Sequence, residues 1–207
     1  MKYCSECAAP VSLQVPAGDS RPRYVCDSCR TIHYQNPNIV AGCIVEEQGR
    51  ILLCRRAIEP RHGLWTLPAG FMENGETSSQ AAERETREEA NARVRVEDLY
   101  TLFDLPHINQ VYMLFRARFE VSGFSAGSES LEVGLFAEEE IPWDSLAFPV
   151  VKATLRLYFA DRAAGAFRLR LGEIQRRAGE PPAYRMRLLE GGSGPQSAGP
   201  LGWRPIE

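Results

Sequence analysis

Three glutamates in one short segment, Glu85, Glu88 and Glu89, have the spacing of a single helix face. With 3.6 residues per turn, Glu88 lies about 60° to one side of Glu85, and Glu89 about 40° to the other. Like charges at this spacing repel one another unless a cation lies between them. Magnesium takes oxygen ligands, usually one or two carboxylates with water and substrate phosphates. The segment therefore indicates a site for a divalent cation.

The glutamates belong to a longer pattern, G-x5-E-x7-R-E-x2-E-E. Its fixed positions are Gly70, Glu76, Arg84, Glu85, Glu88 and Glu89. This pattern resembles the Nudix box, the signature of hydrolases that act on nucleoside diphosphates linked to another group. Thr86 replaces an aliphatic residue of the box and Asn91 replaces a glycine, and neither change alters the charges. Asn is the best non-glycine choice for a left-handed residue at a helix end.

The resemblance implies a role for each box residue. Glu85 and Glu89 are expected to coordinate catalytic magnesium or manganese. Glu88 is expected to be a further ligand, and the carbonyl of Gly70 a backbone one. The box pair Arg84 and Glu76 is expected to hold the loop and the helix in register.

Hydrolysis of a diphosphate requires neutralised oxygens, a positioned water and a base that deprotonates it. Outside the box, we expect Glu129 to supply another metal ligand or this base, with Glu132 or a box glutamate as alternatives. Arg56 is a candidate phosphate ligand or only a charge at the end of a strand. Trp65 is a candidate for stacking on a substrate ring, with packing in the core as the alternative. The three histidines, His33, His62 and His107, lack ligand-like spacing and are expected to be structural or exposed.

Four of the six cysteines form two pairs, Cys4-x2-Cys7 and Cys26-x2-Cys29, with 18 residues between them. Two such pairs are typical of one tetrahedral structural zinc site. The alternatives are disulfides, which suit an oxidising compartment, and a redox motif, which needs no second copy. The prolines and glycine between the pairs leave little core without a metal, which favours zinc. Cys43 and Cys54 lie in apolar runs and are expected to be buried thiols.

Apolar patterning predicts an α/β fold for the rest of the chain. Strands are expected at 39–45, 51–54, 94–103, 111–121 and 131–136. Gln48-Gly49 predicts a turn between the first two strands. Thr77 and Gln80 form a capping-box pattern, which predicts that the box helix begins there. A second helix is expected at 149–160.

Two further segments follow. The alternating runs 167–171 and 184–188 predict an edge hairpin with arginines on its solvated face. The Gly/Ser-rich segment 191–202 predicts a mobile linker.

Composition limits the classes of partner. The 207 residues are 44% apolar and 25% charged, which is ordinary for a globular domain with a small attachment. The net charge of −3 gives no basic field, so we expect no nucleic-acid partner. No apolar run reaches the length of a membrane span, and the N-terminus has no apolar signal region. We therefore expect a cytoplasmic protein without a membrane partner.

Over residues 1–165 the chain resembles the zinc-ribbon subgroup of Nudix hydrolases. The resemblance rests on the ribbon cysteines, the box and the segments 33–37, 63–70 and 135–142. It implies an α/β/α sandwich with a mixed sheet, preceded by a small zinc ribbon. The expected organisation is a ribbon at 1–37, a Nudix domain at 38–165 and a C-terminal extension at 166–207. A homodimer is expected from the same resemblance.

Within the subgroup, the segments 34–37 and 144–148 are similar to enzymes that act on FAD or ADP-ribose. Pro106 is similar to a proline of ADP-ribose hydrolases. The resemblance therefore implies metal-dependent hydrolysis of a small dinucleotide or nucleotide sugar, FAD or ADP-ribose, with release of AMP.

Three alternatives stay open to different degrees. NADH hydrolysis is the nearest, but the Ser-Gln-Pro-Trp-Pro-Phe-Pro segment of NADH diphosphatases is absent. A nucleotide-sensing module without turnover is another, although such modules tend to lose box acids that this chain keeps. An enzyme acting on RNA ends is disfavoured by the charge.

Overall fold

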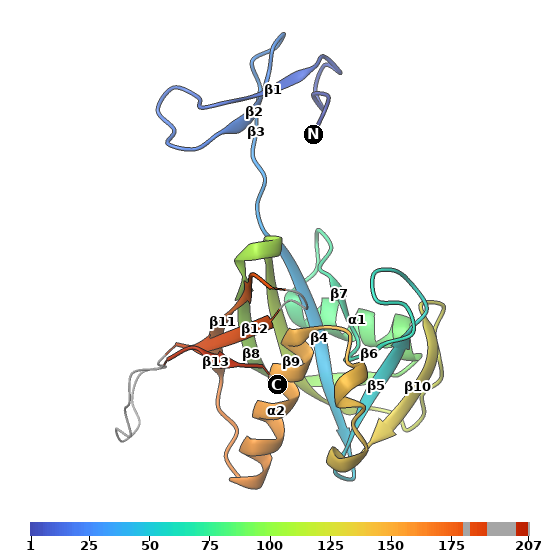
Figure 1. Ribbon diagram of the computed structural model, residues 1–207. Coiled ribbons are helices and arrows are strands. Elements are labelled where there is room, and N and C mark those ends of the chain that lie inside the picture. Colours follow the sequence, from blue (N-terminus) through green and yellow to red (C-terminus); the bar gives the residue numbers. More distant parts are fainter. Residues whose placement is uncertain (180–182, 190–201, 207) are drawn as a thin grey trace. The chain divides into compact units, whose positions relative to one another are not determined.

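The computed structural model describes residues 1–179, 183–189 and 202–206, which form two compact units (Figure 1). The first unit is Met1–Pro37 and the second is Asn38–Glu207. In the part of the chain that the structure describes, no helix is long and apolar enough to cross a membrane.

The first unit is a small antiparallel sheet in the order β1-β2-β3. Its strands are β1 (Val11–Gln14), β2 (Arg23–Cys26) and β3 (Ile32–His33). Each Cys-x2-Cys pair closes a similar turn. Ala8 donates its backbone N–H to the carbonyl of Cys4 (3.0 Å), and Arg30 donates to that of Cys26 (3.1 Å). Ala8 and Arg30 both have left-handed backbone conformations, so the two knuckles are structurally equivalent.

The second unit is built on one mixed sheet in the order β10-β5-β4-β9-β8-β11-β12-β13. The strands are β4 (Asn38–Glu47), β5 (Arg50–Arg56), β8 (Val94–Leu105), β9 (Gln110–Phe119), β10 (Ser130–Phe136), β11 (Arg170–Arg177), β12 (Ala183–Leu188) and β13 (Arg204–Pro205). The short strands β6 (Trp65–Thr66) and β7 (Ala69–Phe71) pair with β5 and β4. Pairing is parallel between β4 and β9 and between β8 and β11, so the predicted mixed sheet is confirmed.

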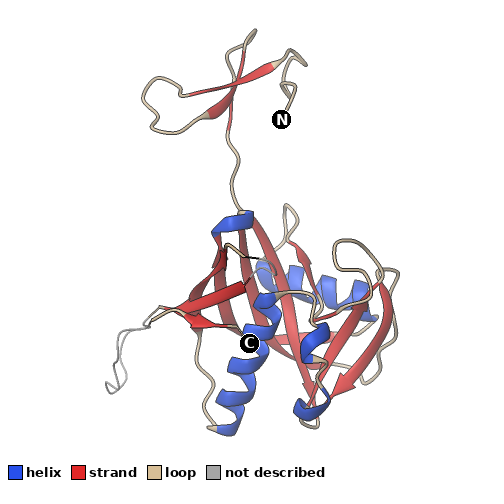
Figure 2. Ribbon diagram, viewed as in Figure 1, coloured by secondary structure: helices blue, strands red, loops and turns tan. Residues whose placement is uncertain are grey.

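Two helices cover opposite faces of this sheet, α1 (Ser78–Ala90) and α2 (Pro149–Ala163) (Figure 2). Successive side chains of a strand point to opposite faces. Along β4, Val40 and Ile44 pack in the core beneath α2, whereas Ala41 and Cys43 pack in the core beneath α1. The result is the predicted sandwich. Three 3-10 turns complete the fold: η1 (Pro106–Ile108), η2 (Glu138–Glu140) and η3 (Trp143–Ser145).

The predicted pairing after residue 165 is present, since β11 and β12 pair antiparallel, but the first strand lies later than the predicted run 167–171. β11 begins at Arg170, because the ring of Phe167 packs against Tyr158 at 5.1 Å and under the guanidinium of Arg116 at 4.1 Å. β11 is also not an edge strand, since it lies between β8 and β12. The described residues of this segment therefore extend the main sheet. Most of the linker predicted at 191–202 lies outside the described residues.

Candidate active site

The box helix α1 begins and ends where the sequence predicts. Thr77 caps its N-terminus, with Gln80 N–H donating to Thr77 Oγ1 (3.2 Å) and Thr77 N–H donating to Gln80 Oε1 (2.8 Å). Asn91 ends the helix in a left-handed conformation with φ of 47°. These two caps set the register of the three glutamates relative to the sheet.

The three glutamates of α1 occupy different environments. Glu89 is buried, with 6% of its surface exposed, and one carboxylate oxygen accepts a hydrogen bond from the Ala69 N–H at 3.3 Å. Burial raises the pKa of Glu89 to about 8, and the charge of Glu85 adds to the increase. Glu85 is half-buried, and burial raises its pKa as well. Glu88 is exposed. In the absence of a cation, the buried pair is therefore costly to ionise.

Arg84 connects the box loop to the helix. Its guanidinium donates to both oxygens of Glu76, at 3.0 and 2.8 Å, and to the carbonyl of Phe71 at 3.0 Å. The same side chain reaches Glu85 at 2.7 Å and Glu88 at 3.1 Å. The hydrogen bonds from Arg84 lower the pKa of Glu76 to about 2. Arg84 thus fixes the loop to the helix and orients two of the helix carboxylates.

Gly70 lies directly against the carboxylate of Glu85. A Cβ atom at position 70 would come within 2.3 Å of that carboxylate, so only glycine fits here. β7 holds Gly70 in place by pairing it with Ala41 of β4. A half-buried carboxylate beside bare backbone, with a second carboxylate at Glu89, offers the oxygen donors that a hard divalent cation prefers. The residues therefore fit the cation that the sequence predicts.

A loop at 122–129 brings Glu129 to the same place. Asn91 Nδ2 donates to the carbonyl of Ala126 at 3.0 Å, and the N–H of Gly127 donates to the carbonyl of Glu89 at 3.0 Å. The carbonyl of Glu129 in turn accepts from the N–H of Ala57 at 2.8 Å. The loop is thus fastened to the end of α1 and to the end of β5, although it has no regular secondary structure.

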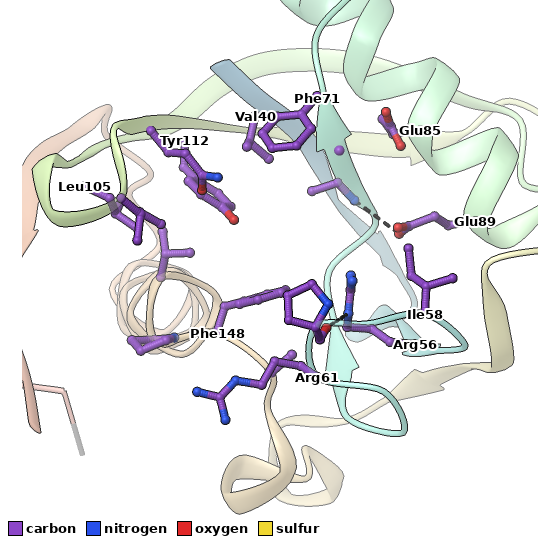
Figure 3. A pocket seen from close by; sticks show the side chains of 18 of the residues that line it. Val40, Arg56, Ile58, Arg61, Phe71, Glu85, Glu89, Leu105, Tyr112 and Phe148 are labelled. Carbon is purple, nitrogen blue, oxygen red and sulfur yellow. Dashed lines mark hydrogen bonds between the residues drawn. The ribbon is translucent and has the colours of Figure 1, made fainter. Parts of the chain in front are cut away.

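These elements surround a cavity of about 750 Å³. Its lining includes Gly70, Arg84, Glu85, Glu88, Glu89 and Glu129. Glu85 and Glu89 come from α1 on one side, and Leu105 and Tyr112 lie on the opposite side (Figure 3). The cavity is within the usual size range of small-molecule and cofactor sites. One part of it is acidic, and another is apolar and aromatic.

Arginines from β5 and from the loop after it also line the cavity. Arg56, from the end of β5, donates its Nε–H to the carbonyl of Pro60 at 3.0 Å and lies 5.1 Å from the ring centre of Phe148 (Figure 3). Arg61 lies in the following loop. Arg56 is therefore held inside the cavity, consistent with a phosphate ligand.

Two candidates are placed outside the cavity. Trp65 packs edge-on against Phe136 at 4.9 Å and borders the core beneath α2. This agrees with the alternative that Trp65 packs in the core and does not stack on a substrate ring. Glu132 forms an exposed ion pair with Arg55 at 3.6 Å. Neither residue lines the cavity, whereas Glu129 does.

Sequence reasoning missed several lining residues. Tyr112 is on the face of β9 opposite to the apolar residues Met113 and Phe115, and Phe148 caps the start of α2. His107 is exposed, as expected, and it also lines the cavity from η1. The alternation along β9 contained a signal for Tyr112, because it assigns Tyr112 to the other face.

The four ribbon cysteines form a second metal centre. The sulfurs of Cys4 and Cys29 are 3.6 Å apart, and those of Cys7 and Cys26 are 3.4 Å apart. Four sulfurs at about 2.3 Å from a tetrahedral zinc lie about 3.8 Å from one another. All four lie within 4.8 Å, and among the described residues no other group of three or more possible ligands does so. His33, expected to be structural or exposed, places Nε2 3.3 Å from Cys4 Sγ.

Family models match both units. The Nudix N-terminal zinc-ribbon model matches residues 2–35, and the NUDIX domain model matches residues 36–156. The chain belongs to the Nudix hydrolase family. Nudix hydrolases use magnesium or manganese, and the ribbon takes structural zinc.

Individual relatives agree with this assignment. An ADP-ribose pyrophosphatase of Methanocaldococcus jannaschii is 30% identical over 56% of this chain and 69% of its own length. A NAD-capped RNA hydrolase, NudC, of Photobacterium profundum is 30% identical over 77% of this chain and 60% of its own. A MutT-like protein of Streptomyces ambofaciens is 34% identical over 49% of this chain and 64% of its own. The chain thus spans about two thirds of the length of these curated relatives.

A solved structure is more similar. The crystal structure of a NUDIX hydrolase from Nitrosomonas europaea is 55% identical to this chain and has a TM-score of 0.79. The match covers 84% of this chain and 99% of that one. The Nudix fold of the second unit is therefore shared with a solved member of the family.

Proposed function

We propose that the chain hydrolyses the diphosphate bond of ADP-ribose or FAD and releases AMP. The observation that carries this proposal is the cavity, in which the box carboxylates face apolar and aromatic side chains. The acidic, cation-binding part of the cavity suits a diphosphate, and the apolar and aromatic part suits a nucleoside. Both are present in one cavity of suitable volume.

The proposed roles are those that the family resemblance implies, and the geometry of the cavity supports them. Glu85, Glu88 and Glu89, with the carbonyl of Gly70, are the proposed cation ligands. A cation held by these residues would neutralise charge on the diphosphate oxygens. Arg56 supplies a fixed positive charge beside them and reduces the repulsion that an attacking hydroxide meets.

Glu129 is the proposed general base. Its loop is fastened at both ends by backbone hydrogen bonds, so the backbone of Glu129, a lining residue of the cavity, is held in place. Glu129 accepts a proton from the attacking water, whose oxygen forms a bond to one phosphorus of the bridge. The bond from that phosphorus to the bridging oxygen breaks, and AMP and the phosphorylated other half of the substrate leave. Glu132 is a weaker candidate because it lies outside the cavity, paired with Arg55.

The choice of substrate is supported by relatives. The Methanocaldococcus jannaschii protein bears the name ADP-ribose pyrophosphatase. NADH or a NAD-capped RNA end is the second candidate, because several relatives bear the name NAD-capped RNA hydrolase. The net charge of −3 favours a small molecule over RNA. We also propose the homodimer that the resemblance implies.

The test is a substrate panel. The purified chain is incubated with ADP-ribose, FAD, NADH and NAD-capped RNA, with Mg²⁺, with Mn²⁺ and with a chelator. Release of AMP is measured for the three small molecules, and release of NMN for the capped RNA. We expect metal-dependent release of AMP from ADP-ribose or FAD at a kcat/KM well above that for the other two. Faster hydrolysis of NADH or capped RNA would refute the proposed substrate, and turnover that resists the chelator would refute the proposed metal role.

A further inference from the structure

The cavity has a second wall that the proposed catalytic roles do not use. β11 and β12 contribute Ile174, Arg176 and Tyr184 to it, and η1 contributes His107 and Ile108. None of these residues belongs to the box or to the loop that carries Glu129. They come from parts of the chain for which the proposed reaction has no role.

The wall is an ordered part of the main sheet. Arg176 and Tyr184 lie directly opposite each other in the β11–β12 ladder, so their side chains share one face. Ile174, two residues before Arg176, points to the same face and is completely buried. β11 is held on its other edge by parallel pairing with β8.

The wall is distant from the acidic part of the cavity. In the sheet order, β11 is three strands away from β4, the strand that holds Gly70 through β7. Neighbouring strands are about 4.8 Å apart, so this separation is about 14 Å. When the diphosphate of a substrate binds at the carboxylates, the end of the nucleotide that is farthest from the diphosphate is therefore expected to contact the wall.

Arg176 is available for a ligand. Three other arginines of this segment, Arg170, Arg185 and Arg187, have partners of their own, which are Asp161, Gln175 and Glu173. Within the described residues, Arg176 has neither an ion pair nor a side-chain hydrogen bond. Arg176 lines the cavity, and a guanidinium carries several N–H donors.

Two rings beside Arg176 add an aromatic surface. Tyr184 and His107 both line the cavity, with ring centres 6.1 Å apart and planes inclined at 52°. Aromatic side chains bind planar rings through offset or edge contacts. A sugar has no aromatic ring, so it forms weaker contacts with such a surface. In ADP-ribose the adenine is the one aromatic ring.

We propose that this wall is the adenine site of the enzyme, with Arg176 and Tyr184 as specificity-determining residues and His107 as a third contact. Adenine offers ring-nitrogen acceptors to the guanidinium and a flat face to the two rings. The proposal rests on the proposed function for the orientation of the substrate. The adenine site adds a role for the C-terminal strands, which select the AMP half of the substrate.

The test measures binding of AMP by isothermal titration calorimetry to the full chain and to the variants Arg176→Gln and Tyr184→Leu. Arg177→Gln is the matched control, because Arg177 is exposed, points to the other face of β11 and does not line the cavity. We expect the Kd for AMP to rise about fivefold to tenfold in the first two variants and to stay at the parental value in the control. Binding of ribose 5-phosphate is expected to be unchanged in all three.

Steady-state kinetics with ADP-ribose give a second readout. Arg176→Gln is expected to raise KM with little change in kcat, because binding of a distant group is equal in the ground and transition states. Parental AMP affinity in both wall variants, or loss of ribose 5-phosphate binding in place of AMP, would overturn the adenine site. That result would leave ADP-ribose hydrolysis itself intact. Conversely, AMP binding that depends on the wall in a chain that hydrolyses neither ADP-ribose nor FAD would overturn the proposed function alone.

Discussion

The N–H of Gly127 donates a hydrogen bond to the carbonyl of Glu89 at 3.0 Å, which ties the loop of the proposed base to the helix of the proposed metal ligands. The approach is so close that a Cβ atom at position 127 would lie 1.8 Å from the carbonyl oxygen of Glu88. Glycine is therefore required for the loop to lie where it does. The distance between Glu129 and the glutamates of α1 depends on this contact.

Gly127→Ala should consequently reduce turnover without removing any charged group. The added methyl must push the loop away from α1, which moves Glu129 and costs about 1–3 kcal/mol of unfolding free energy. We expect kcat to fall at least about tenfold, since small misplacements of a catalytic group have large effects. Ser128→Ala is the control, because Ser128 is exposed in the same loop. Parental kcat in Gly127→Ala would show that the loop position is unimportant.

The two candidate bases outside the box, Glu129 and Glu132, should behave differently. Glu129→Gln removes the proposed base and is expected to lower kcat by about 10²- to 10⁴-fold. Glu132→Gln breaks only an exposed ion pair with Arg55, so its kcat and its stability should stay close to parental values. Both variants are to be measured with ADP-ribose at saturating Mg²⁺. A Glu129→Gln enzyme as active as the parent would transfer the role of base to a box glutamate.

The acidic part of the cavity was predictable from sequence because its residues are close together in the chain. Glu85 and Glu89 share a helix face by the geometry of the helix alone, and Thr77 and Asn91 mark the ends of that helix. The position of Glu129 inside the cavity required the structure, since only the contacts of its loop separate it from Glu132.

The opposite wall was not predictable. Tyr184 begins the alternating run 184–188, which was predicted as one strand of an exposed edge hairpin, and Arg176 lies outside both predicted runs. Their place depends on the parallel pairing of β11 with β8, a contact between segments far apart in sequence. The interpretation of Trp65 was open for a related reason, because its packing partner Phe136 comes from β10. Local pattern carries no information about such distant pairing.

The raised pKa of Glu89 predicts how the metal-free protein responds to pH. Its folded-state pKa is about 8, above the ordinary value of 4.5. Between these values the folded state binds more protons than the unfolded state, so stability falls as pH rises through this window. In a chelator, we expect Tm to decrease from pH 5 to pH 8 by several degrees more in the parent than in Glu89→Gln. Thermal scans of both proteins in matched buffers measure this difference.

Mg²⁺ should oppose the loss of stability that the parent shows as pH rises. A cation favours the ionised carboxylate, so its binding releases a proton from Glu89 at neutral pH. Calorimetry in buffers of different ionisation enthalpy is expected to show proton release near pH 7 in the parent and less release in Glu89→Gln. Equal proton release by the two proteins would exclude Glu89 as the titrating group.

Zinc removal should affect one unit and spare the other. The ribbon is a three-stranded sheet with few buried apolar residues, and the four cysteine sulfurs at its knuckles supply the main cross-link once zinc is bound. Cys26→Ser is therefore expected to lose zinc and to make residues 1–37 sensitive to protease. The second unit has its own cores on both faces of the sheet, so it should stay resistant. Elemental analysis and limited proteolysis measure the two effects.

A cysteine outside the ribbon provides the matched control. Cys43 is completely buried beneath α1, where its thiol donates to the carbonyl of Ala82 at 3.4 Å. Cys43→Ala should lower the stability of the second unit by about 1 kcal/mol, because a buried group and a weak hydrogen bond are lost. It should keep one zinc ion per chain. Zinc retained by Cys26→Ser, or lost by Cys43→Ala, would show that the metal is not held by the four ribbon cysteines.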